Sequence, residues 1–223
     1  MLSIADNLTA TRQRMADACA AVGRSPDEVT LVAVSKRQPD ERLLAAYEAG
    51  QRDFGENYVQ ELLRKRALLP EDARWHLIGH LQTNKAKQVI GAHLIHTVDS
   101  IKVANALEKS ASAQNITQDV LIEVNLAGEA SKAGVAPDAL FPIIELIEGH
   151  AHLRLRGLMC IPPVGDGKRY FSMLRAQRDA LQTRLGRDLD QLSMGMSSDY
   201  ADAIAEGATI VRVGTAIFGA RAS

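Results

Sequence analysis

The chain has 223 residues, among them 26 Lys and Arg and 27 Asp and Glu, which leaves a formal net charge of −1 at pH 7. A balanced charge gives no field that would recruit nucleic acid or an anionic membrane surface, and no apolar run approaches the roughly 18 residues that a membrane span requires. We therefore expect neither kind of partner. Cys19 and Cys160 lie far apart and lack metal-ligand spacing, which favours a reducing, cytoplasmic setting without disulfides or zinc.

Hydrophobic periodicity predicts a leading helix over residues 3–22, followed by strands that alternate with helices. The strands are expected at 29–36, 53–57, 75–80, 94–99, 119–125, 153–160, 189–196 and 209–214. The helices between them are expected at 41–49, 58–69, 84–90, 100–114, 137–149, 170–185 and 198–206. This order predicts an α/β fold, a single (β/α)8 TIM barrel over residues 1–223 with an extra N-terminal helix. An open doubly wound sheet is the alternative.

The first predicted strand ends in a lysine. Residues 29–34 are apolar or β-branched, so we expect this strand to be buried on both faces. Lys36 follows and, by the alternation of a strand, points the same way as Val34 and Val32. It either extends its amine to solvent past the strand end, or it is a desolvated lysine whose partly neutral amine forms a Schiff base. The predicted fold favours the second interpretation, because reactive groups in such barrels collect at C-terminal strand ends.

The loops after the last two predicted strands carry the residues of a candidate phosphate site. Ser197 and Ser198 follow the seventh strand and offer hydroxyl donors, while Gly214 and Thr215 end the eighth, where a glycine lets the backbone approach a ligand closely. Each feature is also common in ordinary caps and turns. Their combination at the two loops where this fold often binds phosphate favours a phosphate cradle.

Arg212 is expected to point into the barrel, close to Lys36, because strand eight lies beside strand one in a closed barrel. A buried arginine requires a partner, and Glu123, Asp53 or a ligand acceptor are the candidates. A lysine, a phosphate cradle and an arginine between them match the outline of pyridoxal 5′-phosphate. The arginine would also lower the pKa of a nearby lysine, which favours the free amine needed for an imine.

A series of motifs along the chain resembles the pyridoxal phosphate homeostasis protein family, small barrels related to the N-terminal domain of alanine racemase. The motifs are Val32-Ala-Val-Ser-Lys36, Phe54-Gly-Glu-Asn-Tyr58 with Gln60 and Glu61, Trp75-His-Leu-Ile-Gly-His-Leu-Gln-Thr-Asn-Lys85, Gly157-Leu-Met-Cys160, Leu192-Ser-Met-Gly-Met-Ser-Ser-Asp199 and Arg212-Val-Gly-Thr-Ala-Ile-Phe-Gly219. They cover most of the chain in order, and the combination is highly specific.

The resemblance implies a role for each candidate residue. Lys36 would carry pyridoxal 5′-phosphate as a covalent imine, and Arg212 would face the pyridine nitrogen. The phosphate cradle would consist of Ser197 or Ser198 with Gly214 and Thr215. Asn57 and Met196 would be further cofactor contacts.

The chain departs from the family pattern in two places. The family commonly reads Ser-Lys-Thr-Lys-Pro where this chain has Ser35-Lys-Arg-Gln-Pro39, so a second lysine beside the cofactor lysine is absent. A lysine-rich C-terminal tail found in some members is missing too. Lys132, in the loop after the fifth predicted strand, is the remaining candidate for a side role in cofactor transfer.

The predicted chemistry favours a carrier over an enzyme. An arginine cannot accept a hydrogen bond, so it requires an unprotonated pyridine, which is a weaker electron sink than a pyridinium. Alanine racemase-like enzymes bring a tyrosine base from a second domain, and this chain ends just past strand eight. The resemblance implies a monomeric regulator of vitamin B6 and amino-acid balance without established turnover, with apo forms of pyridoxal phosphate enzymes as partners.

Two other classes of protein remain as alternatives. An amino-acid racemase that uses pyridoxal phosphate would need a second acid or base, for which His76, His80 and Tyr58 are candidates. A scaffold barrel without a cofactor is the other alternative. The absorbance spectrum of the purified protein separates the carrier from the scaffold, and incubation with amino acids separates the carrier from the racemase.

Overall fold

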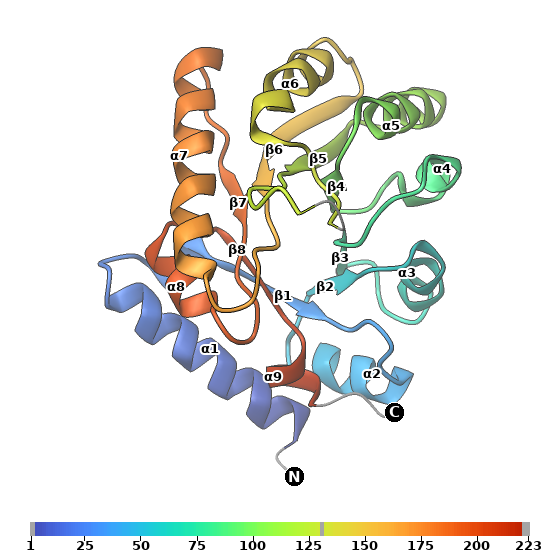
Figure 1. Cartoon of the computed structure of the whole chain (residues 1–223). Coiled ribbons are helices and arrows are strands. Elements are labelled where there is room, and N and C mark those ends of the chain that lie inside the picture. The colour runs from blue at the N-terminus through green and yellow to red at the C-terminus, as the bar shows by residue number, and fades with distance from the viewer. Residues whose placement is uncertain (1–2, 130–131, 220–223) are drawn as a thin grey trace.

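A closed barrel of parallel strands organises the molecule. The computed structural model describes residues 3–129 and 132–219. Across these residues eight strands pair in chain order, and β8 returns to pair with β1, which confirms the predicted (β/α)8 barrel and excludes the open sheet. Helices lie around the outside of the strands, as Figure 1 shows.

The element bounds follow the predicted order closely. The strands are β1 Thr30–Val34, β2 Asp53–Glu56, β3 Arg74–Leu77, β4 Leu94–Val98, β5 Gln118–Glu123, β6 Leu153–Met159, β7 Gln191–Ser193 and β8 Ile210–Val213. The α-helices are α1 Ile4–Ala20, α2 Asp40–Glu48, α3 Val59–Arg66, α4 Ala86–Val89, α5 Ile101–Gln114, α6 Leu140–Glu148, α7 Gly167–Leu185, α8 Tyr200–Ala205 and α9 Thr215–Phe218. Short 3-10 turns are η1 Pro26–Glu28, η2 Thr83–Lys85 and η3 Pro137–Ala139.

Some ends differ from the predicted ranges. Strand β1 stops at Val34, so Lys36 lies in the turn beyond it, and β7 stops at Ser193 before the glycine-containing loop. Helix α8 begins at Tyr200 and not at Ser198. The short helix α9 was not predicted, because four residues are too few to establish a helical period.

The extra N-terminal helix is confirmed and fastens the two ends of the described chain together. Ser3 caps α1 by accepting from the Asp6 N–H, while the Asp6 carboxylate accepts from the Ser3 N–H. Asn7 Nδ2 donates to the Ile217 carbonyl at 2.9 Å, and Arg24 Nη1 donates to carbonyls near the end of α8. The helix therefore covers the seam where β8 meets β1.

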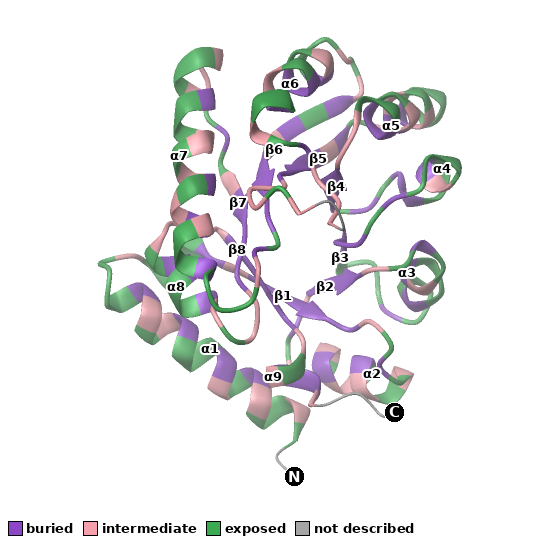
Figure 2. Cartoon of the chain, viewed as in Figure 1, coloured by how far each residue is buried: buried purple, intermediate pink, exposed green. Residues whose placement is uncertain are grey.

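The core has two layers, which the buried strands in Figure 2 separate. The larger layer fills the space between the strands and the surrounding helices. A smaller cluster inside the barrel contains Val32, Leu94, Leu121, Met159 and Ile210. Burial of each such aliphatic side chain contributes about 1.5–3 kcal/mol. Within the described residues, none of the helices combines the length and apolar character that crossing a membrane requires.

One glycine is required where β6 passes β7. Gly157 has φ +157°, and a Cβ atom there would lie 1.8 Å from the Gln191 carbonyl oxygen. The β5–β6 register also shifts at this point, since Val120 pairs with Leu155 and the next residue pairs with Gly157. The irregular pairing bends β6 so that the barrel closes.

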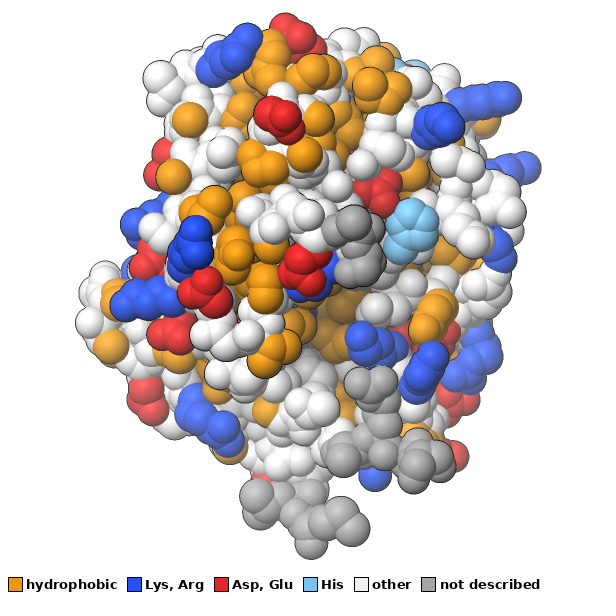
Figure 3. Space-filling view, in the orientation of Figure 1, with side chains coloured by type: hydrophobic (Ala, Val, Ile, Leu, Met, Phe, Trp, Pro, Cys, Tyr) orange, Lys and Arg blue, Asp and Glu red, His pale blue; other side chains and the backbone are white. Residues whose placement is uncertain are grey.

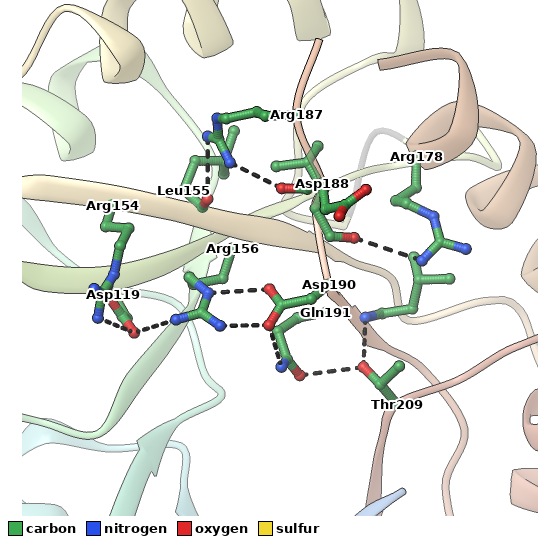
Figure 4. A network of polar contacts seen from close by, with 12 residues as sticks. Asp119, Arg154, Leu155, Arg156, Arg178, Arg187, Asp188, Asp190, Gln191 and Thr209 are labelled. Carbon is green, nitrogen blue, oxygen red and sulfur yellow. Dashed lines mark hydrogen bonds and ion pairs between the residues drawn. The ribbon is translucent and has the colours of Figure 1, made fainter. Parts of the chain in front are cut away.

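Ion pairs cover part of the N-terminal mouth of the barrel (Figure 4). Asp119 at the start of β5 accepts two hydrogen bonds from Arg154 and one from Arg156. Arg156 also donates to Asp190, which precedes β7. Because these side chains are exposed or half-buried, we expect each pair to contribute at most about 1 kcal/mol.

Candidate functional site

Lys36 lies at the C-terminal mouth of the barrel, beside β8. Val32 of β1 is paired in register with Arg212 of β8, so the two strands run out together toward the turn that holds Lys36. Lys36 is half-buried. Figure 3 shows a recess near the centre of this face, with basic, acidic and histidine side chains around it.

A buried ion-pair network holds the turn on both sides of Lys36. The Lys65 ammonium, from α3, donates to the Ser35 carbonyl at 2.5 Å and to carboxylate oxygens of Glu56 and Glu61, each at 2.8 Å. Ser35 Oγ donates to Glu56 at 2.6 Å, and Glu61 accepts the Arg37 N–H at 2.7 Å. The residues before and after Lys36 are thus fixed by side chains of β2 and α3.

The network also stabilises an unusual backbone conformation at Arg37 and an unusual ionisation equilibrium at Glu56. Arg37 has φ +57°, a left-handed conformation that a non-glycine residue adopts at some cost. Burial raises the pKa of Glu56 to about 7, although hydrogen bonds from Lys65 and Ser35 act in the opposite direction. Lys65, fully buried, is therefore the positive charge that keeps this carboxyl group partly ionised at neutral pH.

Arg212 is buried on β8 and lacks the direct carboxylate partner considered from the sequence. Its Nη1 donates to Ser193 Oγ at 2.6 Å and its Nη2 to the Cys160 carbonyl at 2.9 Å; neither Glu123 nor Asp53 pairs with it directly. Burial lowers the pKa of the guanidinium, yet an arginine stays charged in a protein. Of its five N–H groups, two have side-chain hydrogen bonds to described residues, and the other three could donate to a ligand.

The loops after β7 and β8 meet beside the end of β1. The Gly214 N–H donates to Ser197 Oγ at 3.3 Å, and a Cβ atom on Gly214 would lie 3.3 Å from the Val34 carbonyl oxygen. Thr215 follows as the exposed first residue of α9. The structure thus brings Ser197, Gly214 and Thr215 close to the turn of Lys36.

Two other candidates, Met196 and Ser198, face a neighbouring space. Both line a cavity of about 360 Å³ between the loop at residues 162–168 and the start of α8. The Met196 N–H donates to Asp199 Oδ1 at 2.6 Å, which fixes this loop. Both are sequence neighbours of Ser197, which accepts from the Gly214 N–H.

Asn57 presents an unsatisfied acceptor at the mouth. Its Oδ1 is buried and has no hydrogen-bond partner among the described residues. It lines a cavity of about 220 Å³ together with His80, Glu123 and Lys132. A buried acceptor without a partner is costly, so its position favours a donor supplied by a ligand or water. Gly79 is required here, because a Cβ atom would lie 2.3 Å from the Asn57 carbonyl oxygen.

Charged groups in the same cavity are perturbed. Burial, followed by the nearby Asp99, raises the pKa of Glu123 to about 7, while the charge of Arg212 opposes the shift. Lys132 forms an ion pair with Glu129 at 2.8 Å, 31% of its side chain being exposed. The cavity is therefore lined by a carboxyl group whose pKa lies near 7 and by a lysine.

The structure separates the three candidate second bases. His76 is buried inside the barrel between Asp53 and His96, so it does not line the mouth. Tyr58 is exposed, and its hydroxyl accepts from Arg37 Nη2 at 3.1 Å. Only His80 of the three lines the 220 Å³ cavity, where its Nδ1 lies 2.9 Å from Asp99.

Sequence reasoning missed the residues that support Lys36 and Arg212. Lys65 stands in the run Arg64-Lys-Arg66, which is typical of a solvated helix face. Ser193 and His96 are polar residues next to apolar ones in short strands. The signal in the sequence that could have identified Ser193 and His96 is a polar residue at an inward-facing strand position, where a buried polar group needs a hydrogen-bond partner.

Comparison with known proteins defines the class of protein. Residues 4–222 match the family described as alanine racemase, N-terminal domain, so the chain is a barrel of that type. It is 43% identical over 226 residues to the pyridoxal phosphate homeostasis protein of Aquifex aeolicus, covering 99% of both chains. It is 44% identical to the protein of that name from Pseudomonas aeruginosa, covering 99% of this chain and 97% of the relative. The chain belongs to the pyridoxal phosphate homeostasis protein family, as its motifs predicted.

Solved structures agree with this assignment. PipY of Synechococcus elongatus without pyridoxal phosphate is 38% identical with a TM-score of 0.88, covering 97% of this chain and 100% of that chain. PipY with pyridoxal phosphate bound has a TM-score of 0.86 at the same identity and coverage. The alanine racemase of Clostridium difficile shares the fold at 15% identity, with a TM-score of 0.76 over 98% of this chain and 58% of that chain.

Proposed function

We propose that the protein binds pyridoxal 5′-phosphate as an imine on Lys36 and serves its homeostasis without turning over an amino acid. The observation that carries the proposal is the buried Arg212, which is only partly satisfied by Ser193 and the Cys160 carbonyl and lies on the strand beside the turn of Lys36. PipY, a relative of 38% identity, has a structure with pyridoxal phosphate bound. The names of the curated relatives point the same way.

The residues at the mouth fit the chemical groups of this cofactor. The paired Ser197 and Gly214, with Thr215 at the start of α9, offer hydroxyl and N–H donors to a phosphate. Ser198 and Met196 flank them in the same loop. The unsatisfied Asn57 Oδ1 would accept from a donor at the mouth.

Arg212 sets the chemistry that we assign to the site. The cofactor, when bound, supplies an aldehyde that reacts with amines and a ring that withdraws electrons. Arg212 only donates hydrogen bonds, so opposite the ring nitrogen it favours the unprotonated pyridine and a weaker electron sink. The neutral amine of Lys36 is the form that would attack the aldehyde. These effects favour holding the cofactor over breaking bonds in an amino acid.

The proposal includes a setting and partners. We place the protein in the reducing cytoplasm, because Cys19 and Cys160 are free, buried thiols. We also propose that it is a monomer. Apo forms of pyridoxal phosphate enzymes are the proposed recipients. Lys132, which pairs with Glu129 in the cavity next to the site, is the second amine available for transfer. Through the cofactor, the protein would affect both vitamin B6 and amino-acid balance.

The direct test is chemical trapping. The purified protein should be yellow with bound cofactor, and borohydride reduction followed by peptide mass analysis should place the label on Lys36. Lys36→Ala should abolish the label, whereas Lys132→Arg should keep it. A label on Lys132 in the wild-type protein would show that the site assignment is wrong.

An amino-acid racemase is the second candidate, and one observation favours it. Glu123, whose pKa is raised to about 7 by burial, lines the same cavity as His80, so the mouth holds a carboxyl group and an imidazole, two kinds of side chain that act as acid and base in enzymes. Incubation of the loaded protein with D- and L-alanine, serine and lysine in deuterated water distinguishes the two functions. If the protein is a carrier, α-proton exchange should be slow and occur without inversion. Racemisation at about 10 s⁻¹, the median turnover of enzymes, would refute the carrier function.

A further inference from the structure

A chain of side-chain hydrogen bonds runs through the inside of the barrel, away from the mouth. It begins at Arg212 Nη1 and passes through Ser193 Oγ at 2.6 Å and His96 Nδ1 at 2.8 Å. His96 Nε2 then contacts His76 Nδ1 at 3.0 Å, and His76 Nε2 contacts Asp53 Oδ1 at 3.1 Å. The members come from β8, β7, β4, β3 and β2.

All of the members are buried. Their exposed fractions are 4% for Arg212, 0% for Ser193 and His96, 1% for His76 and 6% for Asp53. Asp53 is the first residue of β2 and so marks the N-terminal end of the barrel, where Arg74 binds it with two hydrogen bonds of 2.7 and 2.5 Å. The chain therefore connects the arginine of the candidate site to an anchored carboxylate at the opposite mouth.

The hydrogen bonds have one direction in which every donor, including the Ser193 hydroxyl, has an acceptor. Among the described residues, Ser193 Oγ contacts Arg212 and His96, and arginine cannot accept, so the hydroxyl proton points to His96 Nδ1. Burial, followed by the charges of His76 and Arg212, lowers the pKa of His96 well below its usual range, which leaves this ring neutral. Its one proton is then on Nε2 and is donated to His76 Nδ1.

The same logic fixes the other end. His76 accepts at Nδ1, so its proton is on Nε2 and is donated to Asp53. Burial pushes the pKa of Asp53 upward, but hydrogen bonds from Arg74 and His76 together outweigh it and hold that pKa below its usual range. Asp53 is therefore an ionised acceptor, and every donor in the chain points toward it.

We propose that Ser193, His96, His76 and Asp53 are positioning residues that hold Arg212 for its contact with the cofactor ring nitrogen; the inference rests on the proposed function. In this direction Ser193 donates to His96 and accepts only from Arg212. If the two histidines carried their protons on Nδ1, the Ser193 oxygen would be shared between His96 and Arg212 as donors, and its hydroxyl would lose its acceptor. The ionised Asp53, four hydrogen bonds away, therefore favours the direction in which Ser193 Oγ is bound by the guanidinium alone and holds it in place.

The first test uses the full chain without cofactor, so it does not depend on the proposed function. Protein labelled with ¹⁵N-histidine should show His76 and His96 as neutral rings protonated at Nε2, assigned with His76→Gln and His96→Gln variants. Asp53→Asn, whose amide can donate as well as accept, should make the Nδ1-protonated form of these rings detectable. Protonation at Nδ1 of either histidine in the wild-type protein would overturn the proposed direction.

The second test measures the effect on the cofactor. Ser193→Ala removes only a hydroxyl group, and with it the connection between Arg212 and His96. It should weaken retention of pyridoxal phosphate about tenfold, as loss of one net hydrogen bond predicts. It should also shift the ring nitrogen signal of ¹⁵N-labelled cofactor. His93→Ala is the matched control, because that ring packs against His76 with centroids 5.1 Å apart but has no side-chain hydrogen bond among the described residues.

A double-mutant cycle separates positioning from simple structural support. If Ser193 acts through Arg212, then Ser193→Ala should cause no further loss in an Arg212→Ala background, whereas additive losses would overturn the inference. Unchanged retention and ¹⁵N signal in Ser193→Ala, with normal binding by the wild-type protein, would also overturn it. Failure of the wild-type protein to form the imine would instead refute the proposed function, and the inference with it.

Discussion

Lys65 offers the sharpest test of how the Lys36 turn is held. Lys65→Met keeps the volume of the side chain but removes the buried ammonium that donates to oxygens of Ser35, Glu56 and Glu61. Removing one partner of a buried pair costs about 3–5 kcal/mol, because the other charge stays buried without compensation. We expect the free energy of unfolding to fall by about that amount at pH 8.

The pH dependence of this loss follows from Glu56. Its pKa is already raised to about 7 by burial, and without Lys65 it should rise further. A carboxyl group whose folded pKa is raised stabilises the fold when protonated, and this stability is lost as pH rises through the folded pKa. The penalty of Lys65→Met should therefore be smaller at pH 5 than at pH 8.

Urea unfolding of the cofactor-free protein at the two pH values measures both effects. Lys65→Met combined with Glu56→Gln should recover much of the loss, since the buried charge is then absent. Lys102→Met, an exposed lysine on α5, is the control and should change the stability by no more than about 0.5 kcal/mol. A loss below about 1 kcal/mol, or one independent of pH, would refute the reasoning.

Three further predictions test the site and the barrel. Arg212→Ala should weaken cofactor retention about ten- to a hundredfold, since a hydrogen bond to a charged group contributes roughly 1.5–3 kcal/mol. Arg212→Glu should shift the bound ring toward its protonated form in the absorbance spectrum. Unchanged affinity and spectrum in both variants would contradict the assignment of Arg212. Glu123 has a pKa raised to about 7, so its contribution to stability, up to about 3 kcal/mol, is present below about pH 4.5 and is lost as pH rises through 7. Glu123→Gln should therefore reduce the difference in unfolding midpoint between pH 5 and pH 8, and an unaltered difference would contradict this prediction. Gly157→Ala should destabilise the barrel by more than about 2 kcal/mol in thermal or urea unfolding, because the Gln191 carbonyl oxygen lies 1.8 Å from the new Cβ atom. A variant of unchanged stability would show that β7 can move away from β6 at little cost.

The barrel could be predicted because its signals are local. Each strand is a short apolar run, each helix has its own period, and eight units in order permit few arrangements. The alternation of side chains along a strand was enough to direct Arg212 inward, where the structure places it with 4% of its surface exposed. Lys36 was found in the same way, from its place after β1.

The partners of these residues could not be predicted, because they depend on which layers of the barrel interior meet. His96 of β4 reaches Ser193 of β7 across the interior, a contact set by the tilt and stagger of the strands. Lys65 is hidden for a different reason. It has the same local pattern as its exposed neighbours Arg64 and Arg66, and only the position of α3 over β2 buries it.

The seam between β1 and β8 has a consequence for how the protein is made. On the ribosome, α1 and β1 emerge well before β8, yet β1 pairs with β8, and Asn7 binds the carbonyl of Ile217. The first strand must therefore wait, with one edge unpaired, until β8 has been synthesised. The turn of Lys36 and the strand of Arg212 become neighbours only at that moment. Under the proposed function, the capacity to retain the cofactor would then distinguish chains with a closed barrel from nascent ones.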